Sequence, residues 1–169
     1  MRFYFEIIFL LKLMKVIKGD IISMAQNGDF DVLVHGCNCF NNMNIGFSKK
    51  IKKEFPVSSL ADERTEYGKK HKLGTYSGCS VDLREFDYRI NKKILVLNAY
   101  IQYTLGDGAE LNYLALVKVF QKIKKNFSGK KIVFPLIGLE LKNFSASKVC
   151  EIIEKELEGE DYSLVIDAV

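Results

Sequence analysis

Short apolar runs alternate along this chain with longer segments in which apolar residues recur at every third or fourth position. The short runs predict buried strands, and the longer periodic segments predict amphipathic helices. We expect strands at residues 15–18, 31–35, 74–83, 92–98, 131–136 and 162–166. We expect helices at residues 21–26, 47–55, about 60–70, 109–127 and 145–157.

This alternation of strands and helices predicts an α/β fold, in which a parallel or mixed sheet is covered by helices on both faces. Asp20 can cap the first helix, and Pro56 is expected to end the second. Ser58 and Ser59 can cap the third helix, and the basic stretch 69–72 indicates the solvated end of that helix.

The chain of 169 residues has no internal repeat and no linker long enough to divide it, so we expect one domain. Residues 1–13 are strongly apolar, but they are too few to span a bilayer and are interrupted by Glu6 and Lys12. They fit either an extra edge strand or an N-terminal extension that precedes a domain at 14–169. We expect no association with a membrane.

Charge and cysteine content narrow the class of ligand. The net charge of +4 and the pI of about 8.8 suit an anionic ligand such as a nucleotide, and favour nucleic acid less. Four cysteines without C-x-x-C pairs, and only two histidines, argue against a structural zinc site. We expect no metal and no cofactor. Reduced thiols indicate a cytoplasmic protein, which we expect to be a monomer.

The segment 31–46 carries the strongest indication of function. A buried strand ends in the small polar cluster His35, Gly36, Cys37 and Asn38, and a loop rich in Asn and Gly leads from there into a basic helix. Such an arrangement presents backbone N–H groups to a phosphate. It also places an imidazole and a carboxamide at the carboxyl end of a strand, where open α/β sheets bind their ligands.

Neighbouring strands would gather these groups at one edge of the sheet. If the strands that end at His35, Asn98 and Leu136 are neighbours, their ends lie side by side. We therefore expect one crevice lined by the following residues and loops: Asp20, His35, Asn38, residues 40–46 and residues 137–144.

Six segments in order carry a resemblance to a known family. They are V-I-K-G-D-I at 16–21, V-L-V-H-G-C-N-C-F-N-N-M-N-I-G at 32–46, K-L-G-T-Y-S at 72–77, L-V-L-N-A-Y-I-Q at 95–102, Y-L-A-L at 113–116 and V-F-P-L-I-G at 133–138. From Met14 to about Ile166 the chain resembles a macro domain, the ADP-ribose-binding α/β/α module. The H-G-C-N-C form is similar to the branch of ADP-ribose-1''-phosphate phosphatases and phage macro proteins.

The resemblance implies a three-layer α/β/α fold with a mixed, largely parallel central sheet, and it implies roles for single residues. Asp20 would bind the adenine amino group, and Asn38 the distal ribose. Gly46 would let the first phosphate loop approach the ligand. His35 would activate a water, so that His35 and Asn38 form the catalytic pair of a metal-free hydrolysis of ADP-ribose-1''-phosphate to ADP-ribose and phosphate. The remaining implied ligand contacts are Ile21, Gly36, Cys37, Met43, Asn44, Phe47, Asn98, Tyr100, Gly138, Leu139, Glu140 and Leu141.

Each of the main candidates also has a purely structural interpretation. His35 can be a strand-end histidine that is bonded to backbone, and Asn38 can close a local turn. Asp20 can cap a helix and bind a ligand at the same time. Cys37 and Cys39 fit small packing residues at the end of a strand.

The second phosphate loop, residues 137–145, departs from the family pattern, which is close to I-G-x-G-L-A-G-G. Only Gly138 remains, and each added Cβ restricts the backbone. Glu140 would repel an anion, although Lys142 offsets it in part. Ser145 replaces an acidic residue that would help to polarise the water.

Three hypotheses follow from the sequence: a phosphatase that depends on His35, a binding module without activity, and an RNA or protein interaction domain with a degenerate pocket. The third would use the basic surfaces at 49–53, 69–72 and 122–131, and we rank it last.

Overall fold

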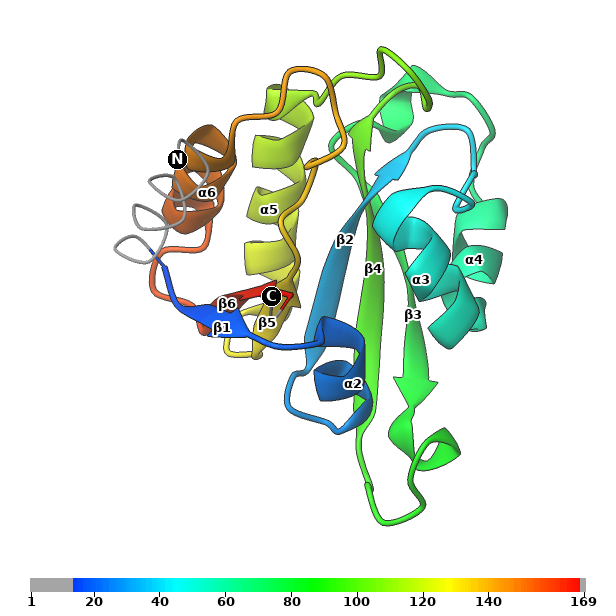
Figure 1. Cartoon of the computed structure of the whole chain (residues 1–169), viewed down its shortest axis with the longest axis vertical. Helices are drawn as coiled ribbons and strands as arrows, with labels where there is room; N and C mark the ends of the chain where they lie inside the picture. The colour runs from blue at the N-terminus through cyan, green and yellow to red at the C-terminus, as the bar shows by residue number, and fades with distance from the viewer. Residues whose placement is uncertain (1–13, 168–169) are drawn as a thin grey trace.

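The computed structural model describes residues 14–167, and the two interpretations of residues 1–13 lie outside this range. Its strands are β1 Val16–Lys18, β2 Val32–Asn38, β3 Tyr76–Asp82, β4 Lys93–Gln102, β5 Ile132–Phe134 and β6 Tyr162–Ile166 (Figure 1). Its helices are α2 Ile21–Gln26, α3 Gly46–Glu54, α4 Pro56–Glu63, α5 Tyr113–Phe127 and α6 Ala146–Glu156, with 3-10 turns η1 Lys70–Lys72 and η2 Leu83–Glu85. No helix among residues 14–167 combines the length and the apolar character needed to cross a membrane.

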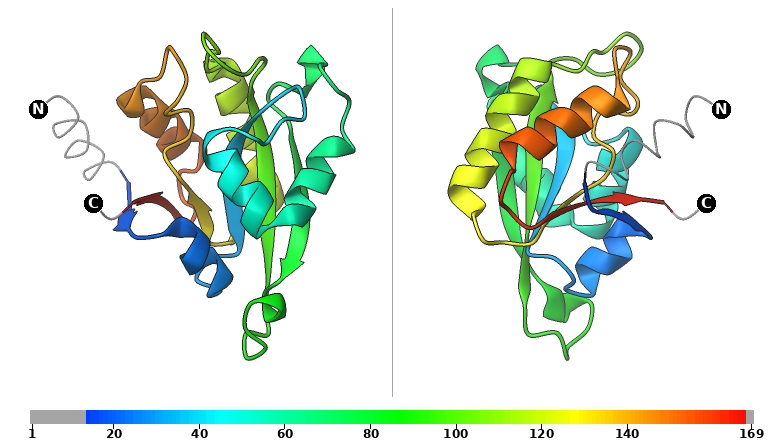
Figure 2. Two further views of the ribbon diagram at one scale, coloured as in Figure 1. Left: turned by 45° about the vertical axis from the view of Figure 1, so that its right-hand side comes forward. Right: turned by 90° about the vertical axis from the view of Figure 1, so that its left-hand side faces the viewer.

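The strands form a single six-stranded sheet in the order β1-β6-β5-β2-β4-β3. All neighbouring pairs are parallel except β3 and β4, which are antiparallel. Helices α5 and α6 cover one face of the sheet, and α3 and α4 cover the other (Figure 2). The prediction of a mixed, largely parallel sheet in a three-layer α/β/α fold is confirmed.

The apolar side chains of the strands form two cores, one on each face of the sheet, because successive side chains along a strand point to opposite faces. Val32 and Val34 pack with α5 and α6, whereas Leu33, between them, packs on the side of α2 and α3. All three residues are fully buried. The near-continuous apolar run of β2 is therefore the pattern of a central parallel strand.

Two groups of predicted elements need correction. The helix expected at about 60–70 is α4, which begins at Pro56 and ends at Glu63. A proline lacks the N–H that the first turn leaves unbonded, so Pro56 both ends α3 and starts α4. Ser58 and Ser59 are consequently buried inside α4 and do not cap it.

The second group concerns the central strands. β2 and β4 continue three and four residues beyond the expected ends at His35 and Asn98. These two polar residues are partners in the parallel register and are fully buried.

Helix α5 begins at Tyr113, four residues later than expected. The Asn112 side chain accepts a hydrogen bond from the N–H of Ala115 over 2.8 Å and caps the helix there.

Candidate functional site

The first loop, residues 39–45, joins the carboxyl end of β2 to the start of α3, and Asn38 closes its beginning. The Oδ1 atom of Asn38 accepts a hydrogen bond from the N–H of Phe40 at 2.9 Å, and its Nδ2 donates to the carbonyl of Asn42 at 2.8 Å. Both ends of the carboxamide are thus used within the loop, and the side chain is only 7% exposed. Asn38 sets the path of the loop in this structure.

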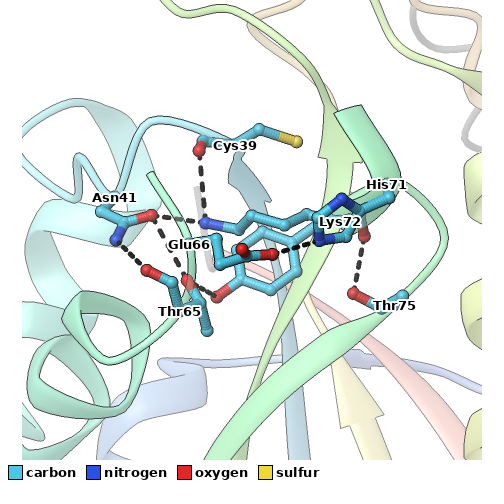
Figure 3. Close-up of polar contacts among 8 residues, drawn as sticks. Cys39, Asn41, Thr65, Glu66, His71, Lys72 and Thr75 are labelled. Atoms are coloured by element: carbon cyan, nitrogen blue, oxygen red, sulfur yellow. Dashed lines mark hydrogen bonds and ion pairs between the residues drawn. The ribbon is translucent and has the colours of Figure 1, made fainter. Parts of the chain in front are cut away.

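Asn41 holds the tip of this loop in an unusual backbone conformation. Its φ is +50°, the left-handed region, which Asn tolerates better than most residues. The Asn41 side chain donates to the carbonyl of Thr65 at 3.0 Å, and its Oδ1 accepts from the ammonium of Lys72. Figure 3 shows the Lys72 side chain reaching between Asn41 and the carbonyl of Cys39, to which it donates over 3.2 Å.

Lys72 is a buried cation, with 4% of its surface exposed. Its ammonium lies 4.3 Å from the centre of the Tyr100 ring, a cation–π contact. Burial lowers the pKa of Lys72, and the charge of Asp62 opposes that shift. Burial likewise raises the pKa of the Asp62 carboxyl, although the Tyr100 hydroxyl donates to it over 2.7 Å.

His35 and Asn98 form a second buried polar pair, on the face of the sheet covered by α3 and α4. His35 Nε2 lies 2.7 Å from Asn98 Oδ1, and His35 Nδ1 lies 3.4 Å from the hydroxyl of Ser48 on α3. The Phe47 ring packs edge-on against the imidazole. Burial lowers the pKa of His35 to about 4, so the ring is neutral at physiological pH.

A series of hydrogen bonds links the His35–Asn98 pair to Asn41, the partner of Lys72. Asn98 Nδ2 donates to the hydroxyl of Ser77 at 3.0 Å, and that hydroxyl lies 2.8 Å from the hydroxyl of Tyr100. Thr65 lies 3.4 Å from the same Tyr100 hydroxyl and also bonds to Asn41. The network therefore runs from His35 under α3 to the tip of the first loop, and no buried side-chain N or O atom of the described residues lacks a partner.

The start of α3 meets the second loop. Gly46 begins the helix with a φ of +57°, and Ile45, the N-cap, makes no side-chain capping bond. A Cβ placed on Gly46 would overlap the carboxylate of Glu140, which comes from the second loop. The two loops predicted to bind phosphate therefore converge on the N-terminus of α3.

The second loop, residues 137–145, is held by hydrogen bonds within itself and to the segment that precedes α5. The N–H groups of Leu141, Lys142 and Phe144 donate to backbone carbonyls at 2.9, 3.0 and 3.1 Å. The Asn143 carboxamide bonds to both the N–H and the carbonyl of Leu111, at 2.7 and 3.0 Å. Three N–H groups of this loop are therefore already bonded to carbonyls, and Lys142 and Asn143 tie the loop to the segment before α5.

A relative from a bacterial virus decides the family. The uncharacterized 17.5 kDa protein in the tk-vs intergenic region of Enterobacteria phage T4 is 34% identical to this chain over 126 residues, 74% of either protein. The chain belongs to the same family as this phage protein. In addition, no family model matches the chain.

Solved structures define the fold. The macrodomain of Mycobacterium tuberculosis DarG is 15% identical, with a TM-score of 0.65, over 91% of this chain and 97% of that one. Thermosipho africanus DarTG in complex with ADP-ribose is 17% identical, with a TM-score of 0.63, over 89% of this chain and 41% of that one. The fold of this protein is therefore the macrodomain fold.

Within this macrodomain, Asp20 stands at the carboxyl end of β1 and caps α2. Its carboxylate accepts hydrogen bonds from the N–H of Ile22 at 3.0 Å and from the hydroxyl of Ser23 at 2.9 Å. These bonds lower the pKa of Asp20, with a smaller contribution from Lys50 of α3. The residue is exposed, so capping leaves its outer surface open to a ligand.

The other predicted site residues divide between the surface and the interior of the macrodomain. Asn44 is exposed on the first loop, and Leu139 and Glu140 are exposed on the second. Gly36 lies on a half-buried strand position, where a Cβ would press on Ile101. Four predicted contacts are buried in the packed cores, and Tyr100 is buried in the polar network: Ile21, Cys37, Met43, Leu141 and Tyr100.

Sequence reasoning missed the buried residues that support the first loop, above all Lys72. Lys72 belongs to a stretch interpreted as a solvated helix end, and His71 beside it is indeed exposed and paired with Glu66. Asp62 and Ser77 had no role assigned. The one signal for Lys72 was its place at the start of K-L-G-T-Y-S, a segment that carried the family resemblance. Among residues 14–167, no group of three His, Cys, Asp or Glu side chains is placed to hold a metal ion.

Proposed function

We propose that this protein binds ADP-ribose, or a nucleotide that contains it, between the two loops at the N-terminus of α3. The convergence of the loops carries the proposal, since Glu140 of the second loop lies against Gly46, where the first loop enters α3. A helix N-terminus that meets two loops is a suitable place for a pyrophosphate. The fold shared with a protein solved in complex with ADP-ribose adds support.

Asp20 is the proposed contact for the adenine amino group. Its exposed carboxylate is charged at neutral pH, because the hydrogen bonds from Ser23 and Ile22 keep its pKa low. A carboxylate accepts hydrogen bonds only, which matches an exocyclic amino group. Asn38 would act on the ligand by fixing the loop that it closes.

We expect binding without hydrolysis. The phosphatase reaction implied by the resemblance needs His35 to reach a water beside the terminal phosphate. In the structure the imidazole is fully buried and contacts Asn98, Ser48 and Phe47. Its pKa of about 4 also makes it a weak base at neutral pH.

Calorimetric titration with ADP-ribose tests the proposal, with the wild type compared with Asn38→Ala. The matched control is Asn91→Ala, which removes the same side chain from an exposed turn outside the strands and helices. We expect binding by the wild type and the control, and a loss of about tenfold or more in Asn38→Ala, because the loop loses two hydrogen bonds. Absence of binding by the wild type at millimolar ADP-ribose would overturn the proposal.

Phosphate release from ADP-ribose-1''-phosphate is measured in parallel to separate binding from catalysis. The expected result is no release above the rate in buffer alone. Release that disappears in His35→Gln would instead establish the phosphatase, and it would require that the contacts around His35 open during turnover.

A further inference from the structure

Glu140 of the second loop reaches Gly46, the first residue of α3. The three heavy atoms nearest to a Cβ built on Gly46 all belong to the Glu140 carboxylate group. The side chain is itself exposed. The group over the start of α3 is therefore the end of a flexible, exposed side chain, which can move without repacking the core.

The N-terminus of α3 favours an anion at this position. Aligned peptide dipoles give a helix N-terminus a partial positive charge. Many helices satisfy it with an acidic residue or a polar cap, but α3 has no acidic residue in its first turn and no capping side chain on Ile45. The carboxylate of Glu140, from a distant part of the chain, supplies the missing negative charge.

A pyrophosphate would compete for the same space. The proposed function places the anionic part of ADP-ribose between the two loops, and like charges at contact distance repel strongly near a protein surface. A ligand must therefore turn the Glu140 side chain away before its phosphates can approach Gly46. Lys142, two residues further along, is exposed and leaves the repulsion only partly offset.

We infer that Glu140 is a specificity-determining residue, which penalises ligands by the negative charge that they bring to the start of α3. This inference rests on the proposed function and refines it. It predicts that the affinity for a nucleoside diphosphate depends on displacement of the Glu140 carboxylate. The affinity for a neutral nucleoside is predicted to be independent of Glu140.

Titration of Glu140→Gln with ADP-ribose and with adenosine tests the inference. The substitution removes the charge and keeps the size of the side chain. We expect affinity for ADP-ribose to rise about tenfold at low salt, and the gain to shrink as salt screens the repulsion. Affinity for adenosine is expected to stay within about twofold, because it carries no phosphate. Glu140→Ala, which removes bulk as well, is expected to raise affinity for ADP-ribose at least as much.

Glu85→Gln is the matched control. Glu85 is exposed in η2, which directly follows β3. Because β3 runs antiparallel to β4, η2 lies at the opposite end of the sheet from the two loops. This substitution changes the net charge equally and is expected to leave affinity for ADP-ribose unchanged. Equal affinity of the wild type and Glu140→Gln, or an equal gain for adenosine, would overturn the inference and leave the proposed function intact. Absence of ADP-ribose binding by the wild type and by both Glu140 variants would overturn the two together.

Discussion

His35 and Asn98 lie side by side in the parallel register of β2 and β4, with His35 Nε2 2.7 Å from Asn98 Oδ1. Asn98 Oδ1 also accepts a hydrogen bond from the hydroxyl of Ser58 at 2.6 Å, and Asn98 Nδ2 donates to the carbonyl of Ser58 at 2.9 Å. A polar pair therefore ties two central strands to α4 in the interior of the protein.

Stability is expected to depend on the protonation of His35. Its pKa is about 4 in the folded protein and near 6.5 in the unfolded chain, so the unfolded chain binds a proton first as the pH falls. The neutral ring contributes stability that is complete above pH 6.5 and is lost toward pH 4, by about 3 kcal/mol.

Urea unfolding of the wild type and His35→Gln from neutral pH to about pH 4 checks this prediction. The difference in unfolding free energy between the two is expected to shrink as the pH falls, because glutamine does not titrate. His71→Gln, which changes the exposed histidine, is expected to follow the wild type. A pH dependence of His35→Gln that parallels the wild type would contradict the prediction.

Lys72→Met is expected to lower the free energy of unfolding by about 2–3 kcal/mol, since the carbonyl of Cys39 and Oδ1 of Asn41 each lose a charged donor and the buried Asp62 loses a nearby cation. Lys69→Met removes an exposed lysine and is expected to change it by no more than about 0.5 kcal/mol. Chemical denaturation measures both, and equal effects would show that the contacts of Lys72 contribute nothing specific.

Asn143→Ala is expected to loosen the second loop locally, since the carboxamide makes two hydrogen bonds to Leu111. Amide hydrogen exchange at Leu111 is expected to quicken, with a loss of about 1–2 kcal/mol in protection. Asn91→Ala is the control, and it is expected to leave exchange at Leu111 unchanged. Unchanged protection in Asn143→Ala would mean that the backbone alone holds this loop.

Elements with complete local signals were predicted to the residue. α2 has an aspartate cap at its start, and β6 is a short apolar run after a charged stretch. Both match their expected bounds. Local sequence settles such elements because the interactions that define them lie within a few residues.

The central strands show where sequence information ends. Polar residues at 35 and 98 indicate strand ends when each strand is considered alone, yet they satisfy each other across 63 positions of the chain. Lys72 poses the same difficulty, because its partners, Asn41 and the carbonyl of Cys39, both lie in the first loop, more than 30 positions earlier in the chain. A buried polar residue becomes recognisable only when its partner's place in the fold is known.

The candidate site was predicted at the level of segments more than of side chains. The two loops meet as expected, whereas Tyr100 and Leu141 turn inward. Nothing in the sequence near Glu140 indicates its position over Gly46, because that contact depends on the conformation of the whole second loop.

The left-handed residue at the tip of the first loop has a consequence for how fast the proposed ligand can bind. Asn41 is fixed by Thr65 and Lys72, through contacts made within the protein. Folding therefore already sets the conformation of this loop, and the proposed ligand does not have to order it. In the proposed complex the exposed Glu140 side chain on the opposite loop has to rotate, a motion of picoseconds to nanoseconds.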